Sequence, residues 1–338
     1  MKILLIKPKH IGDTLLMTPL IRSIKAVYPQ SLLWVVVRKG SEEILSGCPQ
    51  IDRILTTVPP EKKFRKKRDF QATVALITTL RKEGFDYTIE LSGTDRGRWI
   101  ATFSGAVHRI TPQPSGRWSG FWKKIFSRGI QIPTGCHIVE QDYHIASSIL
   151  TLPKAIPPLA FDRSLRIPVN LPIEGSYFVV NPTSRWKEKW WNPENWVLLC
   201  QRLLQKVDFM VLSVGPDPEE QAFGDRIYQQ LDPAKVYPTK GRYSFRELAS
   251  VMAASVAYVG ADTVVMHLAA ACQVPVVALL GPTNERHWHP WKTPALLIKA
   301  REIAGLENIP LQSVPINAIT VEDAWEKIDP WLEPYLPH

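Results

Sequence analysis

The chain has 338 residues, 45% of them hydrophobic and 22% charged, which is the composition of a soluble globular protein. It is too long for one ordinary core, so two domains are expected, and no apolar run reaches the ~18 residues that a membrane-spanning helix needs. The net charge of +9 favours an acidic partner, and the four cysteines lack the spacing of a zinc site or a disulfide framework.

The first half alternates short apolar runs with stretches of helical spacing. Strands are predicted over residues 3–6, 32–37, 54–55 and 87–91, and helices over 70–82, 100–105 and 137–150. Residues 16–27 also have helical spacing, with Pro19 in the first turn behind Thr18 as N-cap, so 12–17 are expected to form a loop or a separate turn. The apolar part of the first strand is too short for a signal peptide, which predicts a cytoplasmic protein.

Two basic segments interrupt this pattern. The run 61–68 is typical of a solvated loop. In 117–128, large apolar residues recur at three- and four-residue intervals with cations between them: Trp118, Phe121, Trp122, Ile125 and Phe126. This segment is either an amphipathic helix packed on its own domain or a basic–aromatic face for a membrane or an anionic glycolipid. Both interpretations stay open, and the chain's twelve tryptophans support the second.

The second half repeats the alternation after a proline-rich stretch. Strands are predicted over 176–181, 209–214 and 236–238, and helices over 195–206, 218–231, 245–254 and 323–332. We therefore expect an α/β protein with a first domain over 1–155, a linker over 156–173, a second domain over 174–320 and a terminal helix and tail over 321–338. A cleft between the two domains is the natural place for a site.

Residues 256–283 carry the most specific pattern in the chain. An apolar run ends at Gly260, a helix of small residues begins at Asp262 or Thr263, and a second apolar run ends in Gly281-Pro282-Thr283. This strand–helix–strand order presents the free N–H groups of a helix N-terminus beside a strand end, which is a site that favours phosphate. An Asp at the position of Asp262 is most commonly a simple N-cap, and a lone helix histidine such as His267 is more often packed or capping than catalytic.

Two further turns follow predicted first strands. Asp13, after Gly12, lies where a carboxylate could remove a proton from a sugar hydroxyl, although an Asp in a turn also satisfies backbone amides. Residues 181–191 offer hydroxyls, amides and several cations, which is typical either of a diphosphate-binding loop or of an exposed charged loop. Neither standard nucleotide fingerprint is present, and His287 and His289 are too weak a pair for a metal site.

Three blocks together resemble the bacterial ADP-heptose:lipopolysaccharide heptosyltransferases, and most closely the branch called heptosyltransferase III. They occur in the family's order and span most of the chain: 11–13, 181–191 with its Lys-Trp-Trp, and 260–283 with Gly-Ala-Asp-Thr and Gly-Pro-Thr. The resemblance implies a GT-B fold, in which two Rossmann-type domains face a central cleft. It also implies inverting transfer of heptose from ADP-heptose to the inner core of lipopolysaccharide, with no cofactor and no obligatory metal.

The resemblance also implies residue roles. Asp13 would be the general base, and Lys189 would neutralise the leaving diphosphate, with Lys187 as the competing lysine. Donor binding would fall to Thr183, Ser184, Lys187, Asp262, Thr263, Met266, His267, Gly281, Pro282 and Thr283, with Met266 near the nucleoside. The acceptor, an anionic glycolipid, would meet Lys7, Lys9, His10 and Gly12.

The implied partners are therefore a nucleotide sugar, the lipopolysaccharide core and the inner face of the inner membrane, which would suit a basic protein. Two other readings stay open: a glycosyltransferase for another sugar or acceptor, and a non-catalytic nucleotide- or glycolipid-binding protein. Nucleic acid is not expected as a partner, because no recognised binding motif is present.

Overall fold

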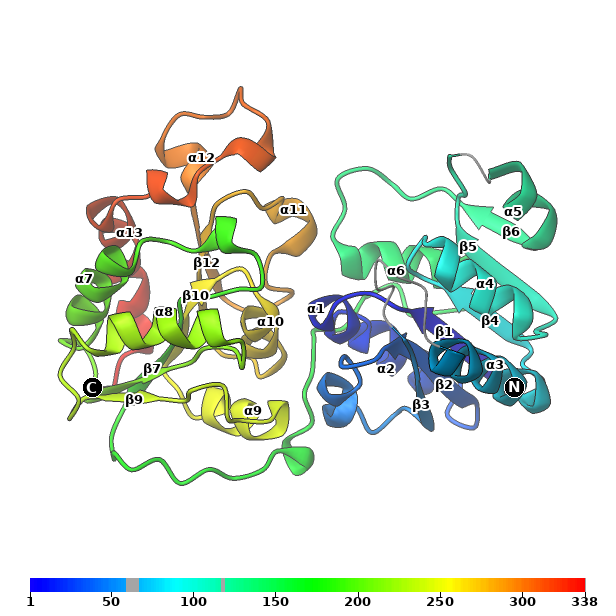
Figure 1. Ribbon diagram of the computed structural model, residues 1–338, viewed down its shortest axis with the longest axis horizontal. Coiled ribbons are helices and arrows are strands. Elements are labelled where there is room, and N and C mark those ends of the chain that lie inside the picture. Colours follow the sequence, from blue (N-terminus) through cyan, green and yellow to red (C-terminus); the bar gives the residue numbers. More distant parts are fainter. Residues whose placement is uncertain (59–66, 117–118, 338) are drawn as a thin grey trace. The chain divides into compact units, whose positions relative to one another are not determined.

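The computed structural model describes residues 1–58, 67–116 and 119–337, without the side chains of 67–70, and it divides into two compact units, Met1–Pro157 and Pro158–His338 (Figure 1). The side chains of the predicted basic run 61–68, and residues 117 and 118 with the tryptophan of the predicted basic–aromatic face, lie outside the described residues.

The first unit contains a parallel sheet of six strands in the order β3-β2-β1-β4-β5-β6. The strands are β1 (Lys2–Lys7), β2 (Leu32–Arg38), β3 (Arg53–Thr57), β4 (Tyr87–Glu90), β5 (His108–Pro112) and β6 (Arg128–Ile130). The helices are α1 (Ile11–Leu15), α2 (Thr18–Val27), η1 (Glu43–Gly47), α3 (Lys67–Glu83), α4 (Asp95–Phe103), α5 (Ser119–Ile125) and α6 (Ile138–Ser147).

Burial on both faces explains why β1 and β2 are almost continuously apolar. One face packs against α3, α4 and α5 around Trp34, Phe85 and Trp122. Helices α2 and α6 contact each other elsewhere in the unit. The strand order reverses between β1 and β4, so the carboxyl ends of these two strands flank the place where such sheets bind ligands.

The second unit has the same strand order, β9-β8-β7-β10-β11-β12, again fully parallel. Its strands are β7 (Tyr177–Asn181), β8 (Phe209–Leu212), β9 (Val236–Pro238), β10 (Ala257–Ala261), β11 (Val276–Leu280) and β12 (Ala295–Lys299). Its helices are η2 (Arg163–Leu165), η3 (Lys187–Lys189), α7 (Pro193–Leu203), α8 (Pro218–Tyr228), α9 (Phe245–Ala253), α10 (Val264–Ala271), α11 (Glu285–Trp288), α12 (Ala300–Ile303), η4 (Leu311–Ser313), η5 (Ile316–Ala318), α13 (Val321–Leu332) and η6 (Glu333–Tyr335).

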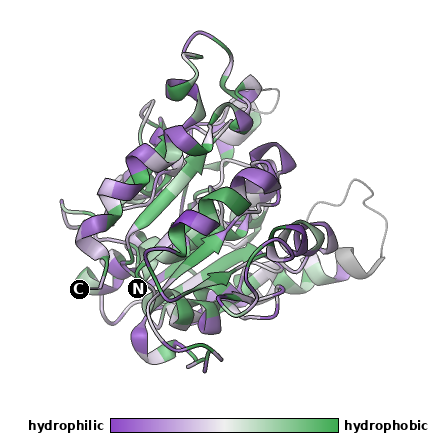
Figure 2. Cartoon of the chain, turned by 90° about the vertical axis from the view of Figure 1, so that its left-hand side faces the viewer, coloured by the Kyte–Doolittle hydropathy of each residue, from purple (hydrophilic) through white to green (hydrophobic). Residues whose placement is uncertain are grey.

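Two apolar layers enclose this second sheet. Helices α7, α8 and α13 pack on one face around Trp191 and Trp196, and α9 and α10 pack on the other around Val179 and Met252. Figure 2 shows the strands as a hydrophobic layer between helices whose outward turns are hydrophilic. The terminal helix α13 is therefore part of this core, because Ala324, Ile328 and Leu332 are buried in it.

The boundary between the units falls at 157/158, inside the predicted linker 156–173. The rest of that segment is tied to the second unit: the N–H of Phe161 donates to the carbonyl of Ala271, and the N–H of Ile167 to that of Arg246. Leu171 and Ile173 pack against the core beside α9 and α10. The prolines thus mark an extended segment that is bound along most of its length to the second unit.

The predicted α/β architecture is confirmed, and the differences are local. Residues 11–15 form a short helix, where a loop or turn was expected, and Pro19 lies in the first turn of α2 as expected. Helix α4 begins at Asp95, five residues before the predicted 100–105, because the Thr94 hydroxyl caps it by accepting from the N–H of Gly97. Strands β5, β6 and β12 were not predicted, and two of them, β6 and β12, lie at sheet edges. Strand β6 has only three residues.

Candidate functional site

The candidate residues of the second unit gather where the strand order reverses, at the carboxyl ends of β7 and β10. Asp262 directly follows β10, and its carboxylate accepts from the ammonium of Lys189 at 2.6 Å and from the hydroxyl of Thr283 at 3.0 Å. Lys189 comes from η3, after β7, and Thr283 follows β11. Three segments that are distant in sequence therefore converge on one carboxylate.

Thr263 joins this group as the N-cap of α10. Its hydroxyl accepts from the N–H of Val265 at 2.9 Å and donates to the side-chain oxygen of Asn181 at 3.2 Å. The prediction that a helix begins at Asp262 or Thr263 is confirmed, and the first amides of α10 lie beside the Lys189–Asp262 pair. A cation and a helix N-terminus side by side form a local field that favours an anion. Gly260 is required nearby, because a Cβ there would lie 2.6 Å from the carbonyl oxygen of Asn181.

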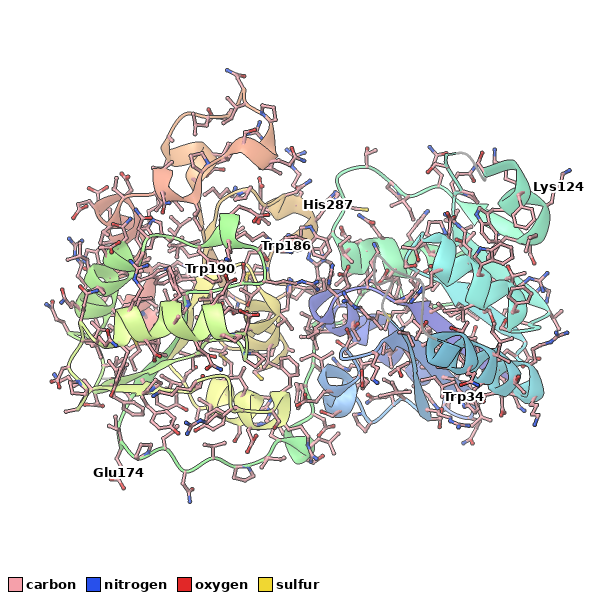
Figure 3. All side chains as sticks on the ribbon, in the orientation of Figure 1. Trp34, Lys124, Glu174, Trp186, Trp190 and His287 are labelled. Atoms are coloured by element: carbon pink, nitrogen blue, oxygen red, sulfur yellow. The ribbon has the colours of Figure 1, made fainter. Side chains whose placement is uncertain are left out.

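The loop after β7 holds its shape through its own hydrogen bonds. The Ser184 hydroxyl donates to the carbonyl of Trp186, and the indole N–H of Trp190 donates to the carbonyl of Ser184 at 2.6 Å. Trp186 and Trp190 of this loop are labelled in Figure 3. The Thr183 hydroxyl donates to the Glu220 carboxylate at 2.7 Å, which ties the loop to α8.

The two candidate lysines have different surroundings. Lys187 pairs with Glu219, and both side chains are more than 60% exposed. The side chain of Lys189 is 19% exposed and that of Asp262 only 8%. Only Lys189, of these two, reaches the end of β10, so the geometry favours Lys189 as the residue that meets a diphosphate there.

Three predicted donor residues have packing roles in the second unit. Met266, in α10, is fully buried in the core that also contains residues of α9, so its described contacts are packing contacts. His267 is also buried, one position further along α10. Gly281 is needed because a Cβ there would lie 2.7 Å from the Cβ of Ile316, so close packing excludes a larger residue. Pro282 and Thr283 follow it, and Thr283 alone of this turn reaches Asp262.

A cavity of about 160 Å³ opens beside this turn, at the carboxyl ends of β11 and β12. Its wall shares Thr283 with the Asp262 cluster and carries both acidic and basic side chains. Mixed charges of this kind offer acceptors and donors for a polyhydroxylated ligand. The residues that line it are Leu280, Gly281, Thr283, Glu285, Lys299, Arg301, Glu302, Glu307 and Leu311.

In the first unit the decisive residue is Asp13, in α1 just beyond the end of β1. Its side chain is 7% exposed, and its Oδ1 is buried without a hydrogen-bond partner among the described residues. A buried carboxylate oxygen costs free energy unless something satisfies it. Oδ1 of Asp13 therefore does not accept a hydrogen bond from a turn amide in the described part of the chain.

Lys7 lies deeper than expected. It ends β1, is 1% exposed, and its ammonium donates to the carboxylate of Asp142 on α6. The charge of Lys7 therefore faces a buried partner, which argues against the expected contact with the acceptor. Lys9 and Gly12 are half-buried, and His10 is exposed, 3.2 Å from the guanidinium of Arg38, so these three remain on the accessible side of the turn.

Two other buried carboxylates lie close to strand ends in this unit, and both have partners. Glu90 ends β4 and accepts from the amides of Ser92 and Gly93 and from the hydroxyl of Thr111. Burial raises the pKa of Glu90 against these bonds. Burial likewise raises the pKa of Asp142 to about 6, although Lys7 opposes the shift. Asp13 differs from both in its unsatisfied oxygen.

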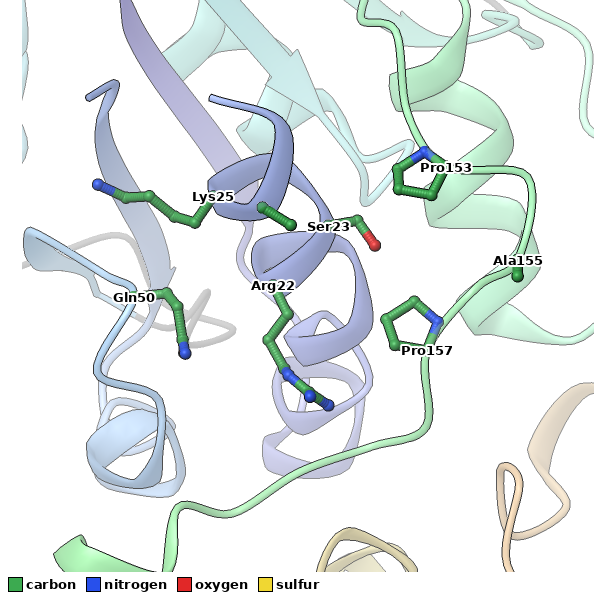
Figure 4. Close-up of a pocket in the computed structure, with 8 residues that line it drawn as sticks. Arg22, Ser23, Lys25, Gln50, Pro153, Ala155 and Pro157 are labelled. Atoms are coloured by element: carbon green, nitrogen blue, oxygen red, sulfur yellow. The ribbon is translucent and has the colours of Figure 1, made fainter. Parts of the chain in front are cut away.

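A second cavity, of about 450 Å³, lies beside the later turns of α2 in the first unit (Figure 4). None of the predicted site residues lines it. Its wall consists of Arg22, Ser23, Lys25, Ala26, Gln50, Pro153, Ala155 and Pro157. The volume of a cavity alone therefore does not locate the candidate site, which is indicated by the strand ends and the buried carboxylate of Asp13.

The sequence analysis missed Asp142, Glu90 and Glu220. Glu220 accepts from Thr183 and from the amide of Gly215, so it belongs to the wall of the second-unit site. Its signal was available, because Gly215-Pro-Asp-Pro follows a predicted strand as the other site turns do. Asp142 lies in mid-helix, 135 residues from Lys7, and no local pattern marks it.

The described residues contain neither a cluster of three metal-ligating side chains nor a helix with the length and apolar character to cross a membrane.

Comparison with known proteins places these features in a family. The model of a protein family described as Glycosyltransferase family 9 (heptosyltransferase) matches residues 73–306. Lipopolysaccharide heptosyltransferase 3 of Escherichia coli is 26% identical over 286 residues, which is 83% of each chain. The E. coli heptosyltransferase WaaC, solved with ADP, superimposes with a TM-score of 0.81 at 19% identity, covering 98% of this chain and 100% of that one. The same enzyme solved with ADP-2-deoxy-2-fluoro heptose gives a TM-score of 0.78 at 19% identity, over 98% and 99% of the two chains. The predicted GT-B-type architecture is thereby confirmed.

Proposed function

Because the chain belongs to glycosyltransferase family 9, the heptosyltransferases, we propose that it transfers heptose from ADP-heptose to the inner core of lipopolysaccharide with inversion at the anomeric carbon. The single observation that carries the residue roles is the pair of unlike carboxylates at strand ends. Asp262 is committed to Lys189 and Thr283, whereas Asp13 keeps a buried oxygen with no partner among the described residues.

On the donor side, Lys189 and the first amides of α10 meet the diphosphate. As the bond from the anomeric carbon to the phosphate oxygen breaks, the electron pair leaves with ADP and negative charge grows on the diphosphate. A preorganised ammonium and a helix N-terminus stabilise that charge as it forms. Asp262 holds the ammonium in place, and the charged cavity beside Thr283 takes the hydroxyls of the sugar.

On the acceptor side, Asp13 is the general base. The acceptor hydroxyl oxygen forms the new bond to the anomeric carbon, and its proton passes to the carboxylate of Asp13. One displacement from the face opposite the leaving group inverts the configuration. Lys9, His10 and Gly12, on the accessible side of the same turn, contact the anionic acceptor.

The central experiment compares Asp13→Asn with the wild type in ADP-heptose binding and in transfer to a truncated core acceptor. We expect unchanged donor affinity and a loss of turnover of about 10²–10⁴-fold, the range for a general base. Full turnover in Asp13→Asn would remove Asp13 from the mechanism. Release of nucleoside diphosphate only from another nucleotide sugar would reassign the donor, and donor binding without turnover by the wild type would favour a binding protein.

We further propose that catalysis needs no metal, since Lys189 and α10 already supply positive charge for the leaving group. Transfer rates in excess EDTA should equal those with added Mg²⁺. A rate that falls with EDTA and returns with Mg²⁺ would contradict this assignment of charge.

The partner surface is proposed to lie on the first unit, on the aromatic–basic patch formed by Trp99, Phe103, Phe121, Lys123 and Lys124. The three rings are 40–43% exposed and contact one another, with centroids 5.6 Å apart for Trp99–Phe103 and for Trp99–Phe121. Both lysines are exposed, and Lys124 points outward from α5 (Figure 3). Exposed rings beside cations suit the headgroup region of an anionic membrane, so the protein would act at the inner face of the inner membrane.

Vesicle co-sedimentation tests this surface. Binding to vesicles containing phosphatidylglycerol should weaken in Trp99→Ser/Phe121→Ser and at high salt, but not in Leu198→Ser, an exposed apolar residue of α7 that serves as the matched control. Equal binding by all three proteins would remove the patch from membrane contact.

A further inference from the structure

Three charged side chains crowd the carboxyl end of β1 inside the first unit. Lys7 and Asp142 form a buried ion pair, with side chains 1% and 3% exposed. Asp13 is 7% exposed, with its unsatisfied oxygen buried. In so little solvent, charges act on one another far more strongly than they would in water.

The carboxylate of Asp142 feels three neighbouring charges from three elements. Lys7 on β1 and Lys9 in the following turn favour its ionised form, whereas Asp13 on α1 opposes it. Burial is the largest influence and raises the pKa of Asp142 to about 6. Asp142 and Asp13 are thus coupled carboxylates beside one buried ammonium.

We propose that Lys7 and Asp142 are positioning residues whose paired charges set how readily Asp13 takes the acceptor proton. When Asp142 is ionised, it cancels most of the charge on Lys7, and Asp13 keeps the basicity that proton removal needs. Without that partner, the lysine charge would act on Asp13 alone and stabilise its carboxylate. The inference rests on the proposed role of Asp13, and it gives a function to a buried ion pair that acts electrostatically on the same carboxylate.

The test is the pH dependence of kcat/KM for heptose transfer, whose acid limb reports the base of the free enzyme. In Asp142→Asn, the amide oxygen still accepts from Lys7 while the negative charge is gone, so the acid limb should move to lower pH and the plateau should fall. In Lys7→Met, two carboxylates remain without their cation, so the limb should move to higher pH. Both shifts should be measurable, because charges that are buried together interact more strongly than charges in water.

The decisive result is that the acid limbs of the two single variants move in opposite directions. General damage to the fold would lower the plateau of kcat/KM, but it would not shift the acid limb down in one variant and up in the other. The double variant Lys7→Met/Asp142→Asn removes both charges, and its acid limb should lie between those of the single variants. If Lys7→Met fails to fold, the nearly isosteric Asp142→Asn still decides the matter. An acid limb of Asp142→Asn that coincides with that of the wild type would overturn the proposal.

Failure of this inference is distinguishable from failure of the proposed function. An active Asp13→Asn variant would remove the base itself, and with it the reason for tuning. An inactive Asp13→Asn variant together with an unmoved acid limb in Asp142→Asn would leave the proposed function intact and refute only the role of the pair.

Discussion

The two units each contain a lysine–aspartate pair near a central strand end, and the pairs differ in their access to water. Lys7 and Asp142 are enclosed within the first unit, whereas Lys189 and Asp262 are 19% and 8% exposed at the ends of β7 and β10. The enclosed pair is buried inside the first unit, where its two charges contact each other. The open pair has a second hydrogen bond, from Thr283, and a cavity beside it.

This difference teaches what each pair can do. Removing two charges from water is costly, and an enclosed pair is maintained only while both partners are present. A partly open pair can exchange one interaction for another, because water or a ligand replaces the missing partner. We therefore expect the first pair to govern stability and the basicity of its neighbour, and the second to govern binding and the rate of transfer.

The largest effect should come from breaking the enclosed pair. Lys7→Met leaves the Asp142 charge buried and unpaired, which should lower the free energy of unfolding by about 3–5 kcal/mol. The matched variant Lys189→Met should cost about 1–2 kcal/mol, since Asp262 keeps the hydrogen bond from Thr283. Denaturant unfolding of both variants measures the difference, and equal losses would mean that burial does not separate the pairs.

The second effect concerns the open pair in catalysis. Lys189→Ala removes the cation that meets the growing charge of the diphosphate, so kcat/KM should fall by about 10²–10³-fold, equivalent to about 3–4 kcal/mol. Steady-state kinetics with ADP-heptose measures this loss, and calorimetry measures the loss of ADP affinity. A variant with wild-type kcat/KM would show that another group neutralises the leaving group.

These differences set the limit of what the sequence could predict. Turn residues after apolar runs located Asp13, Asp262 and Thr263, because parallel strands bring their carboxyl ends to one edge whatever their distance in the chain. The family that the three blocks suggested is confirmed by the match of glycosyltransferase family 9 to residues 73–306. Asp142 could not be found, because its meeting with Lys7 depends on how α6 packs and not on any local spacing.

Met266 illustrates a second limit. The small-residue helix after β10 was predicted correctly, but nearly all its positions are apolar, so periodicity does not distinguish the sheet-facing side from the ligand-facing side. The structure buries Met266 against the sheet and leaves the cap residues Asp262 and Thr263 to the site. Capping chemistry was therefore the more reliable signal in this helix.

A third prediction uses the raised pKa of Asp142. Because the folded protein holds a proton on this group up to about pH 6, while the unfolded chain releases it near pH 4, the contribution of Asp142 to stability falls as the pH rises through this window. The total change should not exceed about 3 kcal/mol. Unfolding curves of the wild type and Asp142→Asn from pH 4 to 7 isolate it, since other carboxylates cancel in the difference. A difference that does not vary with pH would assign an ordinary pKa to Asp142.

The smallest effect should follow from the exposed pair on the same loop as Lys189. Lys187 and Glu219 are 2.6 Å apart, but both are largely solvated, and such pairs contribute no more than about 1 kcal/mol because water and salt screen them. Lys187→Ala should therefore leave the free energy of unfolding and kcat/KM close to those of the wild type, at most a few-fold apart in rate. Parallel kinetics of Lys187→Ala and Lys189→Ala measure the contrast. If Lys187→Ala lost as much activity as Lys189→Ala, the loop would have to rearrange around the donor. The different exposure of the two lysines would then no longer identify the one that binds phosphate.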